Sequence, residues 1–256
     1  MTYIQVIILS IIEGLTEFLP ISSTGHLILT QKLLGINVTE FTKSFNILIQ
    51  LSAILAVVFL YRKKILHSRF LWKQIIIAFI PTGLLGLTLY KHVKGFLLEN
   101  VSVTALALFI GGIILLIIDR IPKLKLGSKN ISNLKTHNLL SIGIFQSLSL
   151  IPGVSRSAAS IVGGLFSGLT RVEAVELSFL LAIPTMIAAS GFDLLKTGFS
   201  FTAHQYTLLL IGSLFSFLSA SLAIKAFTSF VSKHNFTLFA LYRIFLGLLV
   251  WLILKP

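Results

Sequence analysis

The chain has 256 residues, of which 55% are hydrophobic and 11% are charged, so it is far more apolar than an ordinary soluble domain. It contains no cysteine, which excludes disulfides, thiolate nucleophiles and cysteine metal sites. The net charge of +13 would suit nucleic acid, but the basic residues lie in short loops between apolar spans. These features predict an all-α polytopic membrane protein with no nucleic-acid partner.

The first apolar region, Thr2 to Leu29, is broken midway by a proline and a polar cluster within the segment EGLTEFLPISSTGH. No Lys or Arg precedes Lys32, so the region lacks the basic start of a cleaved signal peptide, and we expect it to remain in the mature protein. Non-helical backbone at membrane depth is tolerated only where it is buried in protein or faces a water-filled cavity. We therefore expect a re-entrant helical hairpin here.

Six further stretches are apolar over nearly the length of about 20 residues that a helix needs to cross the hydrocarbon core of a bilayer. In chain order they are Phe45 to Tyr61, Gln74 to Leu89, Val101 to Ile118, Val175 to Leu195, Tyr206 to Phe227 and Phe236 to Leu254. A second broken apolar region, Leu139 to Gly168, follows the third of them, and we expect another re-entrant hairpin there. The expected fold is a single integral membrane domain over residues 1–256, with six transmembrane helices and two re-entrant helical hairpins.

The distribution of Lys and Arg predicts the orientation in the membrane. If both hairpins return to the side they enter from, one face carries Arg62, Lys63, Lys64, Arg69, Lys73, Arg120, Lys123, Lys125, Lys129, Lys135, Arg171, Lys225 and Lys233. The opposite face carries only Lys32, Lys43, Lys91, Lys94, Lys196 and Lys255. Short cytoplasmic loops accumulate Lys and Arg, so we expect the first face to be cytoplasmic and both termini to lie outside.

The layout also predicts an internal repeat, with one copy over about residues 1–118 and the other over about 139–254. The motifs LPISS and IPGVS sit at the breaks of the two hairpins, and each is followed by an SF pair that opens a span. A hairpin plus three spans crosses the membrane an odd number of times, so the second copy would be inverted. Inverted repeats with broken helices place their two breaks together near the bilayer midplane.

Glu13, Glu17 and Arg156 lie inside the two broken apolar regions, and Arg243 lies inside the last predicted span. An unpaired charge near the bilayer centre costs about 2.5 to 3.5 kcal/mol, so these groups must be paired, hydrated or neutralised by a ligand. Glu13 and Glu17 are one helical turn apart, where like charges repel, and we expect a cation beside them. Carboxylate and hydroxyl oxygens suit a divalent cation such as Mg²⁺ or Ca²⁺.

The second break, PGVSRSAAS, has a Pro-Gly turn and Ser155 just before an expected helix start at Arg156. A helix N-terminus offers N–H groups and the positive end of its dipole, and arginine adds a bidentate fork that matches phosphate. Carboxylates and a metal ion from one hairpin, with an arginine and a helix end from the other, predict a site for a phosphorylated ligand.

The segments EGLTEFLPISSTGH and PGVSRSAAS resemble the two signature motifs of the bacterial undecaprenyl-diphosphatases, the BacA-type bacitracin resistance protein family. The resemblance continues through FNILIQLSAILAVV, SFLLAIPTMIAASGFDLLK and ALYRIFLGLLVW. It implies six spans and two re-entrant hairpins in the bacterial cytoplasmic (inner) membrane, with an active site facing the periplasm or cell exterior. The family usually has glycine where Ala158 follows SRS, a small change that should not disable the site.

The resemblance implies hydrolysis of undecaprenyl diphosphate to undecaprenyl phosphate and phosphate, which recycles the lipid carrier of cell-wall synthesis and confers bacitracin resistance. Arg156 and a divalent ion held by Glu17, with help from Glu13, are expected to bind the two phosphates. Ser23 is the candidate nucleophile or close phosphate ligand with His26 as its acid/base partner, and activated water is the alternative attacker. The remaining candidate substrate ligands are Ser22, Thr24, Ser155 and Ser157.

Other interpretations stay open at this stage. Glu13 and Glu17 could be structural partners of Arg156 or Arg243, the hydroxyls of the first break could cap a helix, and His26 could be a satisfied core histidine. A polyprenyl-phosphate transporter or flippase is the alternative function, because broken inverted repeats are common in transporters. The type-two phosphatidic-acid phosphatases place a histidine six residues after the motif arginine, where this chain has Val162, which argues against that class. A homodimer is a further expectation.

Overall fold

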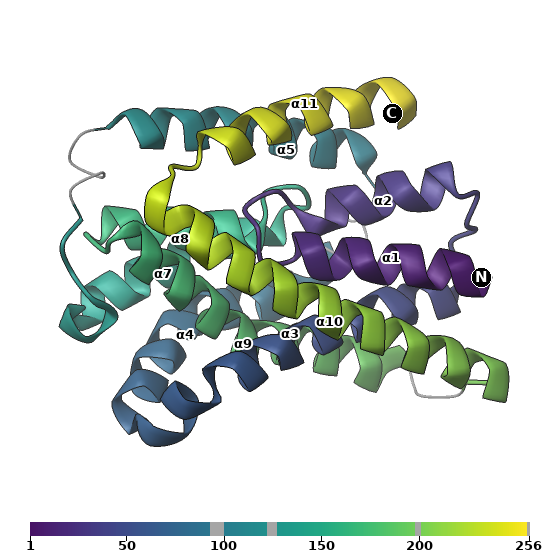
Figure 1. The fold of residues 1–256 in the computed structure, drawn as a ribbon, viewed down its shortest axis with the longest axis horizontal. Coiled ribbons are helices and arrows are strands. Elements are labelled where there is room, and N and C mark those ends of the chain that lie inside the picture. Colours follow the sequence, from purple (N-terminus) through teal and green to yellow (C-terminus); the bar gives the residue numbers. More distant parts are fainter. Residues whose placement is uncertain (93–99, 122–126, 198–200, 255–256) are drawn as a thin grey trace.

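The computed structural model describes residues 1–92, 100–121, 127–197 and 201–254, and its regular structure is helical apart from an isolated bridge between Lys129 and Leu169 (Figure 1). The α-helices are α1 (Tyr3–Thr16), α2 (Ser23–Leu33), α3 (Glu40–His67), α4 (Arg69–His92), α5 (Val101–Arg120), α7 (Thr136–Ser147), α8 (Arg156–Phe166), α9 (Arg171–Thr197), α10 (Ala203–Lys233) and α11 (Thr237–Leu254). Two short 3₁₀ helices, η2 (Ile131–Asn133) and η3 (Leu148–Leu150), flank α7.

Within the described residues, five helices are long and apolar enough to cross a membrane: α3, α4, α5, α9 and α10. They contain the first five predicted spans. The sixth predicted span coincides with α11, whose described apolar stretch, Thr237–Ile253, is shorter than the other five. The first five of these helices also extend beyond the predicted limits, because capping residues and basic residues continue a helix past its apolar part. At the start of α3, for example, Thr39 forms a capping box with Thr42.

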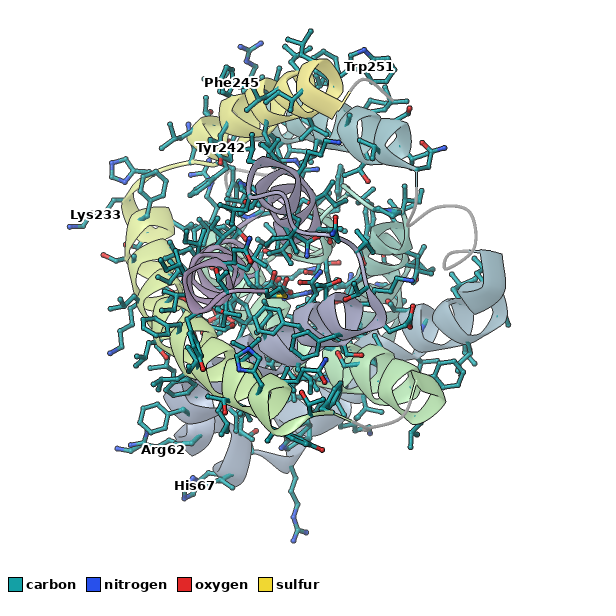
Figure 2. All side chains as sticks on the ribbon, turned by 90° about the vertical axis from the view of Figure 1, so that its right-hand side faces the viewer. Arg62, His67, Lys233, Tyr242, Phe245 and Trp251 are labelled. Atoms are coloured by element: carbon teal, nitrogen blue, oxygen red, sulfur yellow. The ribbon has the colours of Figure 1, made fainter. Side chains whose placement is uncertain are left out.

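Side chains are distributed as expected for a protein in lipid, with polar groups inside and large apolar groups outside. Glu13 and Arg243 are fully buried, whereas Leu210 is 73% exposed. On α11, Phe245 and Trp251 point away from the bundle (Figure 2) and are 62% and 50% exposed. A soluble monomer rarely exposes large contiguous apolar surface, so this distribution and the five apolar helices identify a multi-pass membrane protein.

Both broken regions fold as helical hairpins. Helix α2 packs back on α1 after the break at residues 17–22, and α8 packs back on α7 after η3 and the break at residues 151–155 (Figure 1). Each return helix follows a serine with positive φ, 67° at Ser22 and 72° at Ser155. Residues other than glycine rarely adopt such a conformation, which tends to mark functional segments. The sequence motifs align Ser23 with Ser155, whereas the structure makes Ser22 the counterpart of Ser155, one residue earlier in the chain.

The two halves of the chain exchange packing partners. Helix α1 packs on α10, and α7 packs on α4; likewise α3 packs on α10, and α9 packs on α4. Helices α5 and α11 pack on each other along one side of the bundle (Figure 1). The two breaks meet in the interior, where Ser157 Oγ donates to the carbonyl oxygen of Phe18 at 2.8 Å. Residues more than 130 positions apart in sequence therefore form one polar centre.

Candidate active site

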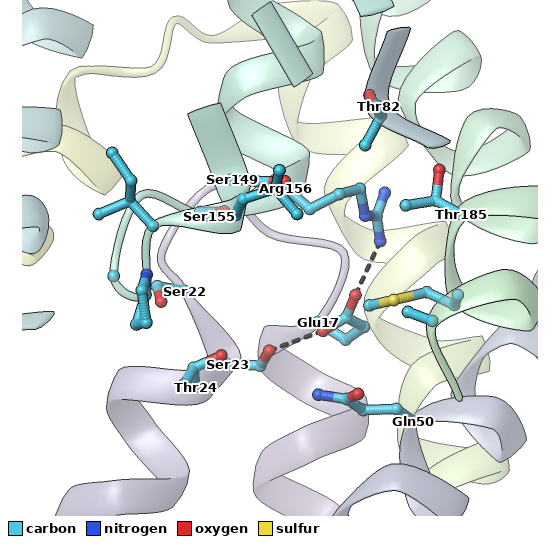
Figure 3. Close-up of a pocket in the computed structure, with 16 residues that line it drawn as sticks. Glu17, Ser22, Ser23, Thr24, Gln50, Thr82, Ser149, Ser155, Arg156 and Thr185 are labelled. Atoms are coloured by element: carbon cyan, nitrogen blue, oxygen red, sulfur yellow. Dashed lines mark hydrogen bonds and ion pairs between the residues drawn. The ribbon is translucent and has the colours of Figure 1, made fainter. Parts of the chain in front are cut away.

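A pocket of about 170 Å³ lies where the two breaks meet (Figure 3). The first break and the start of α2 contribute Glu17, Ser22, Ser23 and Thr24 to its wall, and the second break and the start of α8 contribute Ser155 and Arg156. Further polar side chains come from the surrounding helices: Gln50 on α3, Thr82 on α4 and Thr185 on α9. Six of the residues that the sequence analysis proposed for the site thus line one cavity.

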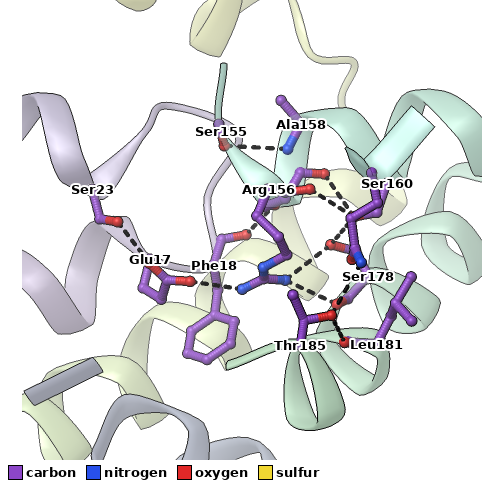
Figure 4. A network of polar contacts seen from close by, with 12 residues as sticks. Glu17, Phe18, Ser23, Ser155, Arg156, Ala158, Ser160, Ser178, Leu181 and Thr185 are labelled. Carbon is purple, nitrogen blue, oxygen red and sulfur yellow. Dashed lines mark hydrogen bonds and ion pairs between the residues drawn. The ribbon is translucent and has the colours of Figure 1, made fainter. Parts of the chain in front are cut away.

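The Glu17 carboxylate links the two breaks. Its Oε1 accepts a hydrogen bond from Arg156 Nη2 at 2.8 Å, and its Oε2 accepts one from Ser23 Oγ at 2.6 Å (Figures 3 and 4). Glu17 is 5% exposed and Arg156 is 8% exposed, so this ion pair is shielded from solvent. A buried pair of this kind strongly couples the two segments, because removal of one partner leaves an uncompensated charge.

The Arg156 guanidinium bonds to Glu17 and Ser178 and leaves its Nε without a partner among the described residues. Its Nη1 donates to the carbonyl oxygen of Ser178 at 2.9 Å, and its carbon lies 5.6 Å from the centre of the Phe18 ring. Its Nε is buried and has no hydrogen-bond partner among the described residues. An unpaired buried N–H is costly, so an acceptor supplied by a ligand would stabilise this guanidinium, whose residue lines the pocket.

The start of α8 places the positive end of a helix at the same wall. Ser155 precedes the helix, and its Oγ accepts a hydrogen bond from the backbone N–H of Ala158 at 3.2 Å (Figure 4). This N-cap fixes Arg156 as the first residue of the helix, where the dipole favours anions. Arg156 and the α8 terminus together form an electropositive wall opposite the serine-rich start of α2.

Ser23 donates its hydroxyl hydrogen to a carboxylate rather than to an imidazole. The 2.6 Å contact with Glu17 Oε2 is a short, charge-assisted hydrogen bond. A serine in this arrangement has a base within reach of its proton, which is the geometry that nucleophilic catalysis requires. The sequence analysis assigned the base to His26, whereas the structure places Glu17 in that contact.

His26 lies beside the pocket but is not part of its lining. Its Nδ1 contacts the carbonyl oxygen of Ser22 at 2.7 Å, and its Nε2 contacts the Tyr242 hydroxyl at 2.7 Å. Because a carbonyl only accepts, Nδ1 carries the hydrogen, and in the neutral ring Nε2 accepts from Tyr242. In this arrangement, both ring nitrogens hold the first break against α11.

Glu13 and Ser157 also lie outside the pocket lining. Glu13 is fully buried, and neither carboxylate oxygen has a hydrogen-bond partner among the described residues. Ser157 Oγ is occupied by its bond to the Phe18 carbonyl. Ser157 therefore joins the breaks, while Glu13 presents an unsatisfied carboxylate one helical turn before Glu17.

A metal ion at this centre would need ligands from outside the protein. The described residues contain no group of three or more His, Asp or Glu side chains that would hold a metal ion. Mg²⁺ is commonly bound by one or two carboxylates and completes its octahedron with water and substrate phosphates. Glu13 and Glu17 are the two carboxylates available for such an ion, and of the two only Glu17 lines the pocket.

Arg243 is a central residue that the sequence analysis named only as an alternative partner of the glutamates. It is fully buried on α11 and donates to the carbonyl oxygens of Pro20 at 3.1 Å, Gly153 at 2.9 Å and Val154 at 3.0 Å. It therefore holds both breaks by their backbones. The sequence feature that could have identified Arg243 is its position as a lone arginine in an apolar span. Gln50, Thr82 and Thr185 of the pocket are likewise polar residues within apolar spans.

The fold and the pocket define a multi-pass membrane protein with an embedded, polar site suited to an anionic ligand. The chain matches the family described as bacitracin resistance protein BacA over residues 6–249, and it belongs to that family. It is 49% identical to a protein of Aquifex aeolicus, over 97% of both chains, and 50% identical to one of Persephonella marina, over 96% of this chain and 97% of that one. A protein of Sulfurihydrogenibium is 49% identical over 98% of this chain and 99% of its own. All three relatives are named undecaprenyl-diphosphatase.

Proposed function

We propose that this protein hydrolyses undecaprenyl diphosphate to undecaprenyl phosphate and inorganic phosphate, and so recycles the lipid carrier of cell-wall synthesis and confers bacitracin resistance. The observation that carries the proposal is the placement of Glu17 between the Ser23 hydroxyl and the Arg156 guanidinium in a pocket of a membrane protein. Family membership and the relatives' names support the same activity and do not favour the transporter alternative.

In the proposed reaction Arg156 and the N-terminus of α8 bind the diphosphate. Ser23 Oγ attacks the terminal phosphorus, its proton passes to Glu17, and the bond to the bridging oxygen breaks, which releases undecaprenyl phosphate. Water then cleaves the phosphoserine and yields phosphate. Phosphoryl transfer depends mainly on positioning and charge stabilisation, which a fixed guanidinium and a helix dipole supply. Direct attack by water, with Glu17 as the base, is the alternative, and trapping of a phosphorylated Ser23 would distinguish the two.

Ser22, Thr24 and Ser155 complete the proposed substrate site, because their side chains line the same pocket. Ser157 acts on this site by tying the breaks together. His26 retains its proposed acid/base role only if its ring leaves the Ser22 carbonyl or the Tyr242 hydroxyl, since both nitrogens are engaged.

A divalent cation, Mg²⁺ or Ca²⁺, is the proposed cofactor, with Glu13 and Glu17 as its protein ligands. When bound, such an ion neutralises charge on the diphosphate. The matched experiment compares Glu13→Gln with Glu40→Gln, an exposed carboxylate paired with Lys43 at 3.0 Å. Glu13→Gln should raise the Mg²⁺ concentration needed for half-maximal activity, whereas Glu40→Gln should not. Equal Mg²⁺ dependence in both variants would exclude Glu13 as a ligand.

The proposed topology has six spans and two re-entrant hairpins, arranged as an inverted repeat in the bacterial cytoplasmic membrane with the site open to the periplasm or cell exterior. The exchanged packing partners of the two halves support the repeat. Because the chain has no cysteine, single cysteines at Lys32 and Lys64 can be labelled without background. An impermeant thiol reagent should label position 32 in intact cells and leave position 64 unlabelled, and the reverse pattern would overturn the orientation.

The activity itself is tested by phosphate release from undecaprenyl diphosphate by purified protein in detergent, with and without EDTA. Release of one phosphate per lipid, abolished by Glu17→Gln, is the expected result. If the protein releases no phosphate but moves the lipid between the leaflets of a vesicle, the transporter alternative replaces the phosphatase.

A further inference from the structure

The pocket has two walls of different chemistry. Glu17, Ser23 and Arg156 form a polar end, whereas Leu150, Ile151, Met186 and Ala189 form a largely apolar side. The Thr185 hydroxyl on that side is already bonded to the carbonyl oxygen of Leu181. The diphosphate of the proposed substrate needs only the polar end. The apolar side next to it is therefore available to contact the rest of the substrate, which is a long hydrocarbon chain.

One face of α9 runs along the pocket from its closed end to its open end. Ser178, whose carbonyl holds Arg156, is fully buried, and Ala182 one turn further is also fully buried. Thr185 and Met186 are half-buried, and Ala189 is exposed. With a rise of 1.5 Å per residue, Ser178 and Ala189 lie about 16 Å apart along the helix. The α9 wall of the pocket is therefore buried beside the arginine and exposed at Ala189.

The opening lies among apolar residues that face outward. Ile151 on the second break, which lines the pocket, is 38% exposed, and Leu148 on the adjoining η3 is 52% exposed. In a membrane protein such a surface meets lipid chains. A mouth bordered by these side chains opens sideways into the bilayer rather than into water.

The other rim of the pocket has the opposite character. Thr24 on α2 and Gln50 on α3 line it, and Gln31 Nε2 donates to Asn46 Oδ1 at 3.2 Å between the same two helices. A hydrocarbon that passed along this rim would desolvate amide and hydroxyl groups without replacing their hydrogen bonds. The α2–α3 rim therefore suits water and phosphate, and it disfavours the lipid tail.

We propose that the prenyl tail leaves the pocket between the second break and the C-terminal half of α9, across Ile151 and Ala189, and that the small side chain at position 189 sets access for long prenyl chains. This inference rests on the proposed phosphatase function. It assigns tail recognition to one side of the pocket, next to Met186, a flexible apolar side chain that adapts to a branched chain. Ala189 is a specificity-determining residue for chain length in this arrangement.

The test compares Ala189→Phe with Ala188→Phe. Both alanines are exposed neighbours on α9, but only Ala189 lines the pocket. For each purified variant, kcat/KM is measured with undecaprenyl diphosphate and with isopentenyl diphosphate, whose single isoprene unit is too short to reach the rim. Blocking the tail should lower the ratio of long-chain to short-chain kcat/KM about tenfold in Ala189→Phe, and the ratio in Ala188→Phe should equal that of the wild type.

Each outcome decides the proposal. An unchanged ratio in Ala189→Phe, with wild-type hydrolysis of both substrates, would show that the tail leaves elsewhere and would leave the phosphatase function intact. Equal changes of the ratio in both variants would show that any large side chain at this part of α9 has the same effect, and this result would overturn the proposal. If wild-type protein hydrolyses neither substrate, the proposed function fails first. Should Ala189→Phe misfold, Ala189→Met provides the same comparison with a smaller change.

Discussion

Two buried arginines meet the same pair of helix breaks in different ways. Arg243 is fully buried and directs its donors to backbone carbonyl oxygens of both breaks, so its role is complete without a ligand. Arg156 pairs with Glu17, lines the pocket and keeps a buried Nε without a partner among the described residues. The comparison teaches that burial alone does not distinguish a structural charge from a functional one, whereas the partners of each donor do.

Arg156→Lys should have the largest effect, because this variant keeps the charge but loses the planar fork. If the guanidinium grips the diphosphate, loss of a preorganised donor costs about 2.7 to 4 kcal/mol, or about 10² to 10³ in rate. We expect kcat/KM for phosphate release to fall at least about a hundredfold while the thermal midpoint changes little.

Arg171→Lys is the matched control, because Arg171 also faces a carboxylate, with Nη2 3.7 Å from Asp119 Oδ1, but it does not line the pocket. Its kcat/KM should stay near that of the wild type. A folded Arg156→Lys protein with near-native turnover would make Arg156 a structural counter-ion and remove the contrast with Arg243.

Arg243→Lys should act mainly on stability. A lysine reaches fewer of the carbonyl oxygens that Arg243 now satisfies, and buried carbonyls left without donors cost about 1 to 3 kcal/mol each. We expect a clearly lower thermal midpoint of the detergent-solubilised protein, with kcat/KM per folded molecule reduced far less than in Arg156→Lys. The exposed Arg62→Lys is the control. A hundredfold loss of activity at an unchanged midpoint would place Arg243 among the substrate ligands.

The different roles of Arg156 and Arg243 could not be predicted from the sequence, although the spans and the breaks could. Apolar length predicted the spans, and the proline-containing polar motifs at Glu17 and Arg156 located both breaks, because charges and prolines inside apolar regions are conspicuous. Partners were not predictable: the pairing of Ser23 with Glu17, and of His26 with Tyr242, depends on tertiary packing that no local pattern encodes. The motifs align Ser23 with Ser155, but the structure pairs Ser22 with Ser155 as the positive-φ residue before each return helix. Backbone dihedral angles define the start of a helix, and a sequence alignment of two short motifs does not contain them.

Ser157→Ala tests a bond between the breaks that involves neither arginine. Ser157 Oγ donates to the Phe18 carbonyl at 2.8 Å and is fully buried, so its loss leaves a buried acceptor unsatisfied. We expect a loss of about 1 kcal/mol in the free energy of unfolding, seen as a modestly lower thermal midpoint, and a KM within a few-fold of the wild type. A large rise in KM with an unchanged midpoint would restore Ser157 as a direct substrate ligand.

The smallest effect is expected from Tyr242→Phe, which extends the same distinction to His26. The tyrosine is 42% exposed, and its ring stacks on the imidazole with centroids 5.5 Å apart, so phenylalanine keeps the stacking and loses only the hydrogen bond to Nε2. If His26 positions the first break, the Nδ1 contact with Ser22 is enough to hold the ring, and kcat/KM should remain within about threefold of the wild type, which corresponds to less than 1 kcal/mol. The control is Tyr3→Phe, since Tyr3 forms an exposed ring contact with His204 far from the pocket lining. If His26 instead transfers a proton, freeing Nε2 changes its basicity, and the pH dependence of kcat should shift in Tyr242→Phe but not in Tyr3→Phe. Such a shift would return His26 to the reaction and show that a fully hydrogen-bonded polar group beside the pocket can still take part in the chemistry.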